Sequence, residues 1–201
     1  AQMQDAFDIN RVSLGGPVFD VEKLSWLNGQ WLREQSDEQF LDILLDWAYN
    51  RDYAMKIIPH LRQRVETLSD VADKAAFCFN GMPAISEASF EHKQYGGEDM
   101  KVWLQYLLWA YEARNDWNRD GLFADAKAIA DTLDVKIKDF LFPAFVAIAG
   151  TSASFSVVDS MEIIGADLSR ARLRNAIEVL GGVSKKQMKK LEKAYRDLPV
   201  D

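Results

Sequence analysis

The sequence predicts an all-α fold, and three observations support this prediction. Apolar residues recur at spacings of three and four, which places them on one face of a helix. Capping pairs and glycines stand where helices would begin and end. No segment alternates apolar and polar residues before a hairpin turn, as strands do. A length of 201 residues and a hydrophobic content of 48% are sufficient for a packed core.

Four apolar stripes predict four helices, and the first of them follows a capping box made by Ser36 and Gln39. The stripes are Phe40, Leu41, Leu44, Leu45 and Ala48; Trp103, Leu104, Leu107, Leu108 and Tyr111; Leu122, Ala126, Ile129, Ala130 and Leu133; and Leu173, Ala176, Ile177 and Leu180. Gly181 and Gly182 are a stop signal for the fourth helix. We expect these stripes to lie in the core, together with Trp26 and Trp31.

A fifth, basic helix is predicted near the end of the chain. Ser184 and Gln187 form a second capping box, and Met188, Leu191 and Tyr195 share one face after it. Glycines 96 and 97 mark the main internal boundary. We therefore expect two helical subdomains, residues 34–96 and 97–201, preceded by the end of another unit in residues 1–33.

The charge is unevenly distributed along the chain. The net charge is −7, yet residues 166–201 carry four Arg and five Lys against three Asp and two Glu, a net charge of +4. Residues 1–165 then carry a net charge of −11. A basic tail on an acidic body fits either a polyanion partner or a solvated helix face, and charge alone favours the solvated face.

The sequence holds few residues that could support catalysis or bind a metal. Cys78 is the single cysteine and lies in an apolar run, which indicates a buried, reduced thiol and a cytoplasmic setting. His60 and His92 have no metal-ligand partner at helical spacing, and His60 is read as a surface residue. No nucleophile elbow, phosphate loop or dinucleotide fingerprint occurs. The chain therefore reads as a helical binding module without a cofactor.

No apolar run reaches the ~18 residues of a membrane span, and no secretory leader or initiator methionine opens the chain. We therefore expect no membrane partner, and we expect the sequence to be a trimmed form or a fragment of a longer protein.

Several segments resemble the bacterial glutamyl-tRNA synthetase family. Residues 18–30 read Val-Phe-Asp-Val-Glu-Lys-Leu-Ser-Trp-Leu-Asn-Gly-Gln and are similar to a specific block after the catalytic half of that family. Residues 7–13 match the stretch before it, and residues 62–68, Arg-Gln-Arg-Val-Glu-Thr-Leu, resemble a family Arg-x-Arg motif. Weaker likenesses follow in the same order at residues 143–150 and 161–165.

The resemblance implies a C-terminal, all-helical anticodon-binding region of the class I synthetase type. The parent enzyme would attach glutamate to tRNA(Glu) with ATP and Mg²⁺ in a catalytic domain. Neither catalytic signature of that domain occurs in this sequence. The expectation is therefore no catalytic residue and no cofactor in this chain, with tRNA(Glu) as the partner of a cytoplasmic monomer.

The resemblance assigns the reading of the third anticodon base to Arg64. In the family, an arginine at this position accompanies discrimination against tRNA(Gln). The planar guanidinium can both stack on a base and donate two hydrogen bonds, which suits an unstacked loop base. Without the resemblance, Arg64 would be read as an exposed arginine at a helix end.

The resemblance also implies that other bases meet Phe145 and residues 151–157. Phe145 stands where the family has an arginine, and a phenyl ring can stack on a base but cannot donate to it. Thr151, Ser154 and Val157 belong to a loop that approaches the anticodon in the family. An ordinary Ser-rich cap of a helix at residues 157–164 is an equally good interpretation of this loop.

Candidate phosphate contacts are Arg62, Arg170, Arg172 and Arg174. The lysines of the last helix are read as solvated. An alternative function is an all-helical domain that binds another protein and no nucleic acid, and salt dependence would separate the two. A short synthetase that glutamylates a modified base is disfavoured, because that family lacks this region.

Overall fold

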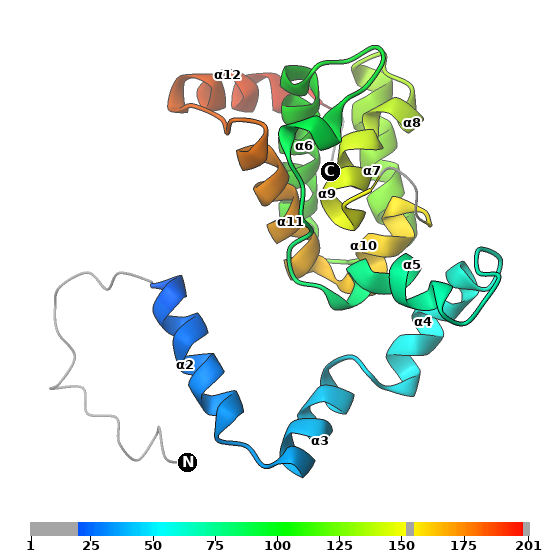
Figure 1. Cartoon of the computed structure of the whole chain (residues 1–201). Coiled ribbons are helices and arrows are strands. Elements are labelled where there is room, and N and C mark those ends of the chain that lie inside the picture. The colour runs from blue at the N-terminus through cyan, green and yellow to red at the C-terminus, as the bar shows by residue number, and fades with distance from the viewer. Residues whose placement is uncertain (1–19, 152–154, 199–201) are drawn as a thin grey trace, which may run out of the picture. The chain divides into compact units, whose positions relative to one another are not determined.

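A computed structural model describes residues 20–151 and 155–198, and every regular element in these ranges is helical, which confirms the all-α prediction. Figure 1 shows the chain as a series of helices joined by short loops. The chain divides into two compact units, residues 1–49 and 50–201. The division into two anticodon-binding subdomains, residues 34–96 and 97–201, is a different division and stays a prediction.

The first unit contains α2 (Val21–Arg33) and α3 (Asp37–Trp47). The carboxylate of Asp20 accepts a hydrogen bond from the backbone N–H of Lys23 at 3.0 Å and begins α2. Ser36 and Gln39 form the predicted capping box of α3. Both helices therefore begin where local hydrogen bonds satisfy the first free N–H groups.

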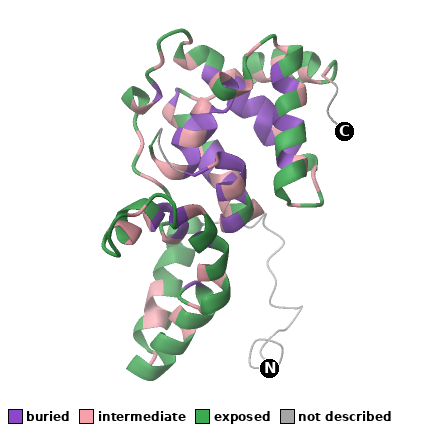
Figure 2. Ribbon diagram, turned by 90° about the vertical axis from the view of Figure 1, so that its right-hand side faces the viewer, coloured by how far each residue is buried: buried purple, intermediate pink, exposed green. Residues whose placement is uncertain are grey.

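Neither helix of the first unit contains a buried residue (Figure 2). Trp26 is 59% exposed and Trp31 is 50% exposed, so the prediction that they lie in the core was wrong. Phe40, Leu41 and Leu45 are also exposed, whereas Ala48 is buried. The stripe at residues 40–48 correctly predicts a helix with an apolar face, but within α3 no residue of that face is buried by the rest of the described chain.

The second unit contains α4 to α12. Its helices are α4 (Arg51–Leu61), α5 (Asp70–Phe79), the 3₁₀ helix η2 (Glu87–Phe90), α6 (Gly97–Ala113), α7 (Arg119–Thr132), α8 (Ile137–Phe140), α9 (Phe142–Ala149), α10 (Val157–Ile164), α11 (Ala166–Val179) and α12 (Lys185–Tyr195). Helix α6 packs against α7 and α11, and α9 packs against α10 and α11. The two capping residues predicted for the last helix, Ser184 and Gln187, are confirmed.

The larger core of the second unit lies among α6, α7, α9, α10 and α11. Met100, Leu104, Tyr111, Leu122 and Ile129 are among its fully buried members. The predicted stripes of α6, α7 and α11 lie in this core, except that Leu133 is partly buried. Because burial of one such side chain stabilises by roughly 1.5–3 kcal/mol, this cluster dominates the stability of the unit.

A smaller core joins α4 and α5 to α10. Its buried members are Ile57, Leu61, Ala75, Phe77, Cys78, Phe155 and Ile163. Cys78 is free and buried, as the apolar run predicts. Residues from both predicted subdomains share this cluster, so the elements that carry the candidate site are packed directly on one another. Figure 1 shows α4, α5 and α10 at one end of this unit and α12 at the other.

Candidate nucleic-acid interface

Arg64 lies in a turn just after α4. Asn50 caps the start of α4 by accepting the N–H of Tyr53 at 2.8 Å, and the helix ends at Leu61, two residues after Pro59. The exposed guanidinium of Arg64 donates from Nη1 to the carbonyl oxygen of His60 at 2.8 Å. This bond fixes one edge of the guanidinium, which has five N–H donors in all.

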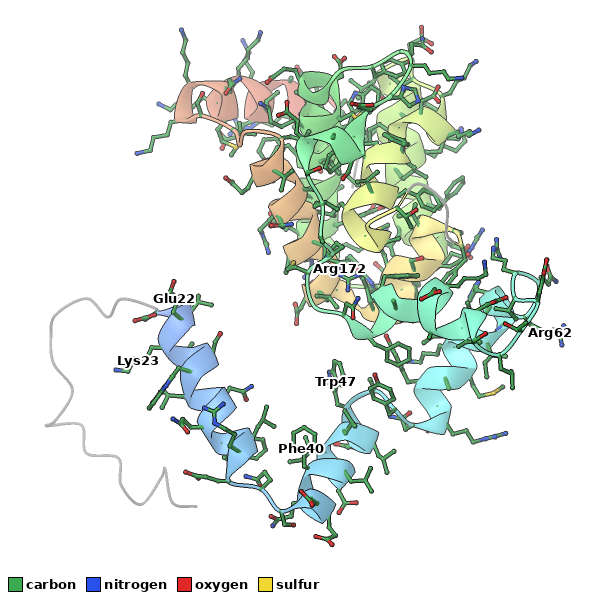
Figure 3. All side chains as sticks on the ribbon, viewed as in Figure 1. Glu22, Lys23, Phe40, Trp47, Arg62 and Arg172 are labelled. Atoms are coloured by element: carbon green, nitrogen blue, oxygen red, sulfur yellow. The ribbon has the colours of Figure 1, made fainter. Side chains whose placement is uncertain are left out.

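Arg62 is the C-cap residue of α4 and is exposed. Figure 3 shows its side chain projecting away from the helices at the end of α4. The side chain of Arg62 is therefore open to solvent.

The loop between Arg64 and α5 is organised by Asp70. Its carboxylate accepts the backbone N–H groups of Glu66 at 2.8 Å and Thr67 at 3.1 Å, and the hydroxyl of Thr67 at 2.8 Å. These hydrogen bonds, that from Glu66 first, hold the pKa of Asp70 below its ordinary value. The side chain of Asp70 thus holds the backbone just after Arg64, while the turn that carries Arg64 is closed by the bond from its own N–H to the carbonyl of Leu61 at 2.7 Å.

His60, Phe155 and Asp159 connect this turn to the start of α10. The rings of His60 and Phe155 stack with centroids 5.3 Å apart and planes 18° apart. Nδ1 of His60 lies 3.9 Å from Oδ2 of Asp159, and the other oxygen of Asp159 forms an ion pair with Nε of Arg119 at 2.9 Å. His60 is therefore partly buried between elements, and the reading of it as an ordinary surface residue was incomplete.

The residues predicted for the other anticodon contacts lie in different environments. Val157 is the first residue of α10 and is 2% exposed, so its side chain is inside the protein. Phe145 is partly buried against the larger core, and Thr151 is exposed. Ser154 lies outside the described residues. Ser156 caps α10, as the alternative interpretation of this loop expects.

Thr151 lies beside a pocket between α5 and the end of α9. The pocket has a volume of about 330 Å³, and Asp73, Lys74, Asn80 and Thr151 are among its lining residues. Gly150 turns the chain here with a φ of 71°, a left-handed conformation that glycine adopts without a Cβ clash. Thr151 and Lys74 therefore line the same pocket although they lie far apart in the sequence.

Arg172 lies inside the protein, which removes it from the candidate phosphate contacts. Its guanidinium donates to the carbonyl oxygens of Phe77, Asn80, Gly81 and Ile148. Figure 3 shows the side chain at the junction between α11 and the chain after α5. A fully buried guanidinium with four carbonyl partners cannot meet a phosphate at the surface in this conformation.

Arg170 and Arg174 both have protein partners. Arg170 donates from Nε and Nη2 to the carbonyl oxygen of Tyr111, at 3.0 and 2.6 Å, and lies over the ring of Trp117. Arg174 pairs with Glu112, and its side chain is 54% exposed. Arg174 can exchange this surface partner for a phosphate at little cost, whereas Arg170 cannot.

Sequence reasoning missed His60, Phe155, Asp159 and Arg119. They come from α4, the segment before α10, α10 itself and α7, so no short motif could have grouped them. Among the described residues, no group of three His, Cys, Asp or Glu could hold a metal ion. Within the same ranges, no helix is long and apolar enough to cross a membrane.

Comparison with known proteins gives a match to one family. Residues 38–177 match the family described as "Anticodon binding domain". The chain is 90% identical over 199 residues to the glutamate–tRNA ligase of Alcanivorax borkumensis, which covers 99% of this chain and 40% of that protein. It is 51% identical over 200 residues to the glutamate–tRNA ligase of Marinobacter nauticus, covering 99% of this chain and 41% of that protein. The chain thus spans about 40% of the length of these curated relatives.

A solved structure shares the fold. The crystal structure of a glutamate tRNA ligase from Elizabethkingia meningosepticum, in complex with its amino acid, matches with a TM-score of 0.57 and 24% identity. The match covers 87% of this chain and 35% of that chain.

Proposed function

Because the chain belongs to the anticodon-binding domain family, we propose that it recognises the anticodon loop of tRNA(Glu) as part of a glutamate–tRNA ligase. Relatives that bear this name match nearly the whole chain, which supports the choice of tRNA. Attachment of glutamate, with ATP and Mg²⁺, is then the task of a catalytic domain outside these 201 residues.

The observation that carries this proposal is the exposed guanidinium of Arg64. One of its donors is held by the carbonyl of His60, and the backbone at Glu66 and Thr67, just after it, is held by Asp70. An exposed, oriented arginine at a helix end can donate two hydrogen bonds to the edge of an unstacked base. Arg64 reads the third anticodon base, at which tRNA(Glu) and tRNA(Gln) differ.

The remaining contacts are assigned by position. Thr151 and Ser154 meet the other bases, and Phe145 offers part of a ring for stacking. Val157 acts by anchoring the start of α10, because its side chain is buried. Arg62 and Arg174 supply the phosphate contacts.

The proposed setting is a monomeric cytoplasmic enzyme that acts on RNA away from membranes. Residues 34–96 and 97–201 form its two anticodon-binding subdomains, and residues 1–33 end the stem-contact region. The resemblance of residues 18–30 to the family supports this division.

The test is the substitution Arg64→Gln, with binding of tRNA(Glu) and tRNA(Gln) transcripts measured side by side. We expect the preference for tRNA(Glu) to fall by roughly 1–3 kcal/mol, the range for a bidentate base contact in DNA recognition. A glutamine side chain keeps some hydrogen-bonding capacity but loses the charged, planar fork.

Arg62→Gln is the matched control, because Arg62 is an exposed arginine in the same turn. It should weaken binding of both tRNAs equally, as expected for a phosphate contact. An unchanged preference after Arg64→Gln would refute the role of Arg64.

A further inference from the structure

We propose that His60 is a positioning residue for tRNA discrimination: its ring holds the last turn of α4 against the segment that begins α10, and thereby orients Arg64. This inference rests on the proposed function. His60 does not touch RNA in this proposal; it acts through the backbone carbonyl that accepts the hydrogen bond from Arg64.

The last turn of α4 needs support from outside the helix. Pro59 has no backbone N–H, so the carbonyl of Met55 lacks the donor that a regular helix would supply. Beyond Pro59, the turn is closed by the bond from Arg62 N–H to the carbonyl of Ile58 at 3.0 Å. A turn with a missing bond is more easily displaced than the interior of a helix.

Two side chains tether this turn to the rest of the unit. Leu61 points into the smaller core and is 4% exposed. His60, one residue earlier, stacks on Phe155, which is itself 1% exposed. Because Phe155 also packs on Phe77 with centroids 5.0 Å apart, the ring beneath His60 is fixed from a second side. The stack therefore connects the turn to a buried ring of the smaller core.

Asp159 is the acidic group nearest to the imidazole ring on the α10 side. Its carboxylate lies 3.9 Å from Nδ1 of His60 and is held on its other oxygen by Arg119 at 2.9 Å. The backbone N–H of Arg119 in turn donates to Glu162 at 3.1 Å. The imidazole thus faces a carboxylate whose own position is determined by α7 and α10.

The carbonyl oxygen of His60 determines the position of the Arg64 guanidinium, because the two are joined by a hydrogen bond. It accepts from Nη1 of Arg64 at 2.8 Å, the one hydrogen bond of this guanidinium in the described part of the chain. If the last turn of α4 shifts, the acceptor shifts, and the remaining donors of Arg64 no longer meet a base edge at hydrogen-bonding distance. Loss of the His60 ring should therefore reduce discrimination specifically.

The experiment is a double-mutant cycle of His60→Ala and Arg64→Gln in the 201-residue chain. The ratio of dissociation constants for tRNA(Gln) and tRNA(Glu) transcripts is measured for the wild type, both single variants and the double variant. We expect His60→Ala to lower this ratio by roughly two- to tenfold, the range that a stacked pair is worth. In the Arg64→Gln background, His60→Ala should leave the ratio unchanged, because its effect passes through Arg64.

His92→Ala is the matched control. His92 also faces an aspartate, at 3.7 Å from Asp139, and stacks on Tyr95 with centroids 5.6 Å apart. It lies between η2 and α6 and has no bond to the turn after α4. We expect both alanine variants to lower the melting temperature, but only His60→Ala to change the ratio.

Two further variants keep the proposal testable. His60→Phe retains a ring for Phe155 and should keep the ratio closer to wild type than His60→Ala does. His60→Gln, which has no ring, replaces the alanine variant if that variant fails to fold.

An unchanged ratio for His60→Ala would overturn the proposal, as would equal losses in both backgrounds. In either case a reduced ratio for Arg64→Gln would leave the proposed function standing. If Arg64→Gln itself does not reduce the ratio, the role of Arg64 and this inference fail together.

Discussion

Arg172 is a buried cation whose charge is balanced by backbone dipoles. It is 0% exposed, and it makes no ion pair within the described residues. Burial raises the pKa values of Cys78 and Tyr53 to about 12, so both neighbours are neutral at pH 7. The guanidinium instead meets carbonyl oxygens at the ends of α5 and α9, where the helix dipoles place negative charge.

We expect Arg172→Met to lower the free energy of unfolding by at least ~3 kcal/mol. Four carbonyl groups lose their donor, and the two buried ones, those of Phe77 and Ile148, each cost roughly 1–3 kcal/mol when left unsatisfied. Arg172→Lys should not restore stability, because an ammonium group cannot reproduce the planar fork. Urea unfolding followed by circular dichroism measures the difference.

Arg174→Met is the control for Arg172. Its partner Glu112 lies at the surface, so the cost should stay below about 1 kcal/mol. Equal destabilisation by the two substitutions would contradict the account of Arg172 as the residue that holds α5, α9 and α11 together.

The sequence could not predict the environment of Arg172. Its partners Phe77, Gly81 and Ile148 lie far away in the chain, and they accept through backbone oxygens that any residue type has. The proximity of His60 to Asp159 could not be predicted either, because the two residues also lie far apart in the sequence. Arg64, by contrast, belongs to a short motif, and its exposure just after α4 fits both interpretations of it, so its role stays a prediction.

At the scale of elements, the turn between α4 and α5 depends on Asp70. The pKa of its carboxyl group is lower in the folded protein than its ordinary value, because backbone N–H groups bond to the charged form. A lowered folded pKa stabilises the protein above the unfolded pKa, which is ~3.9 for Asp. This contribution is lost as the pH falls through the folded pKa.

Asp70→Ala should therefore lower the melting temperature most at pH 7. The difference from the wild type should shrink as the pH falls below the unfolded pKa of ~3.9 and through the lower folded pKa, where the carboxyl group of the folded wild type becomes protonated. Thermal unfolding at pH 7 and pH 3 measures both differences.

Asp73→Ala is the control for Asp70. Asp73 also lies in the first turn of α5, but it accepts none of the three hydrogen bonds from Glu66 and Thr67. If Asp70→Ala lowers the melting temperature by the same amount at pH 7 and pH 3, the role assigned to the Asp70 carboxylate is wrong.

Helix starts and ends could be predicted better than helix burial. The capping boxes of α3 and α12 depend on residues three positions apart, and both are present. The stop after α11 is also confirmed, with φ values of 91° at Gly181 and 65° at Gly182. Burial of the α3 stripe failed because periodicity identifies an apolar face without identifying what packs on it.

At the scale of the whole molecule, an acidic chain with a net charge of −7 is proposed to bind RNA through local arginines. Such binding releases counterions, and log K falls with log salt by about 0.7 per phosphate neutralised on a single strand. We expect a slope of about 1.4 in magnitude for tRNA(Glu), which corresponds to the two phosphates contacted by Arg62 and Arg174.

Arg62→Gln should reduce the magnitude of this salt slope by roughly 0.7, because it removes one phosphate contact. Binding measured by fluorescence anisotropy across a series of salt concentrations gives both slopes. A slope near zero would favour the alternative of an apolar docking surface for a protein partner.

The most direct test of the central claim changes a single base of the RNA. A tRNA(Glu) transcript in which only the third anticodon base is replaced by that of tRNA(Gln) is compared with the unaltered transcript. We predict that the wild-type chain binds the altered transcript more weakly, whereas the Arg64→Gln variant binds the two with nearly equal affinity. Equal binding of both transcripts by the wild-type chain would contradict the account.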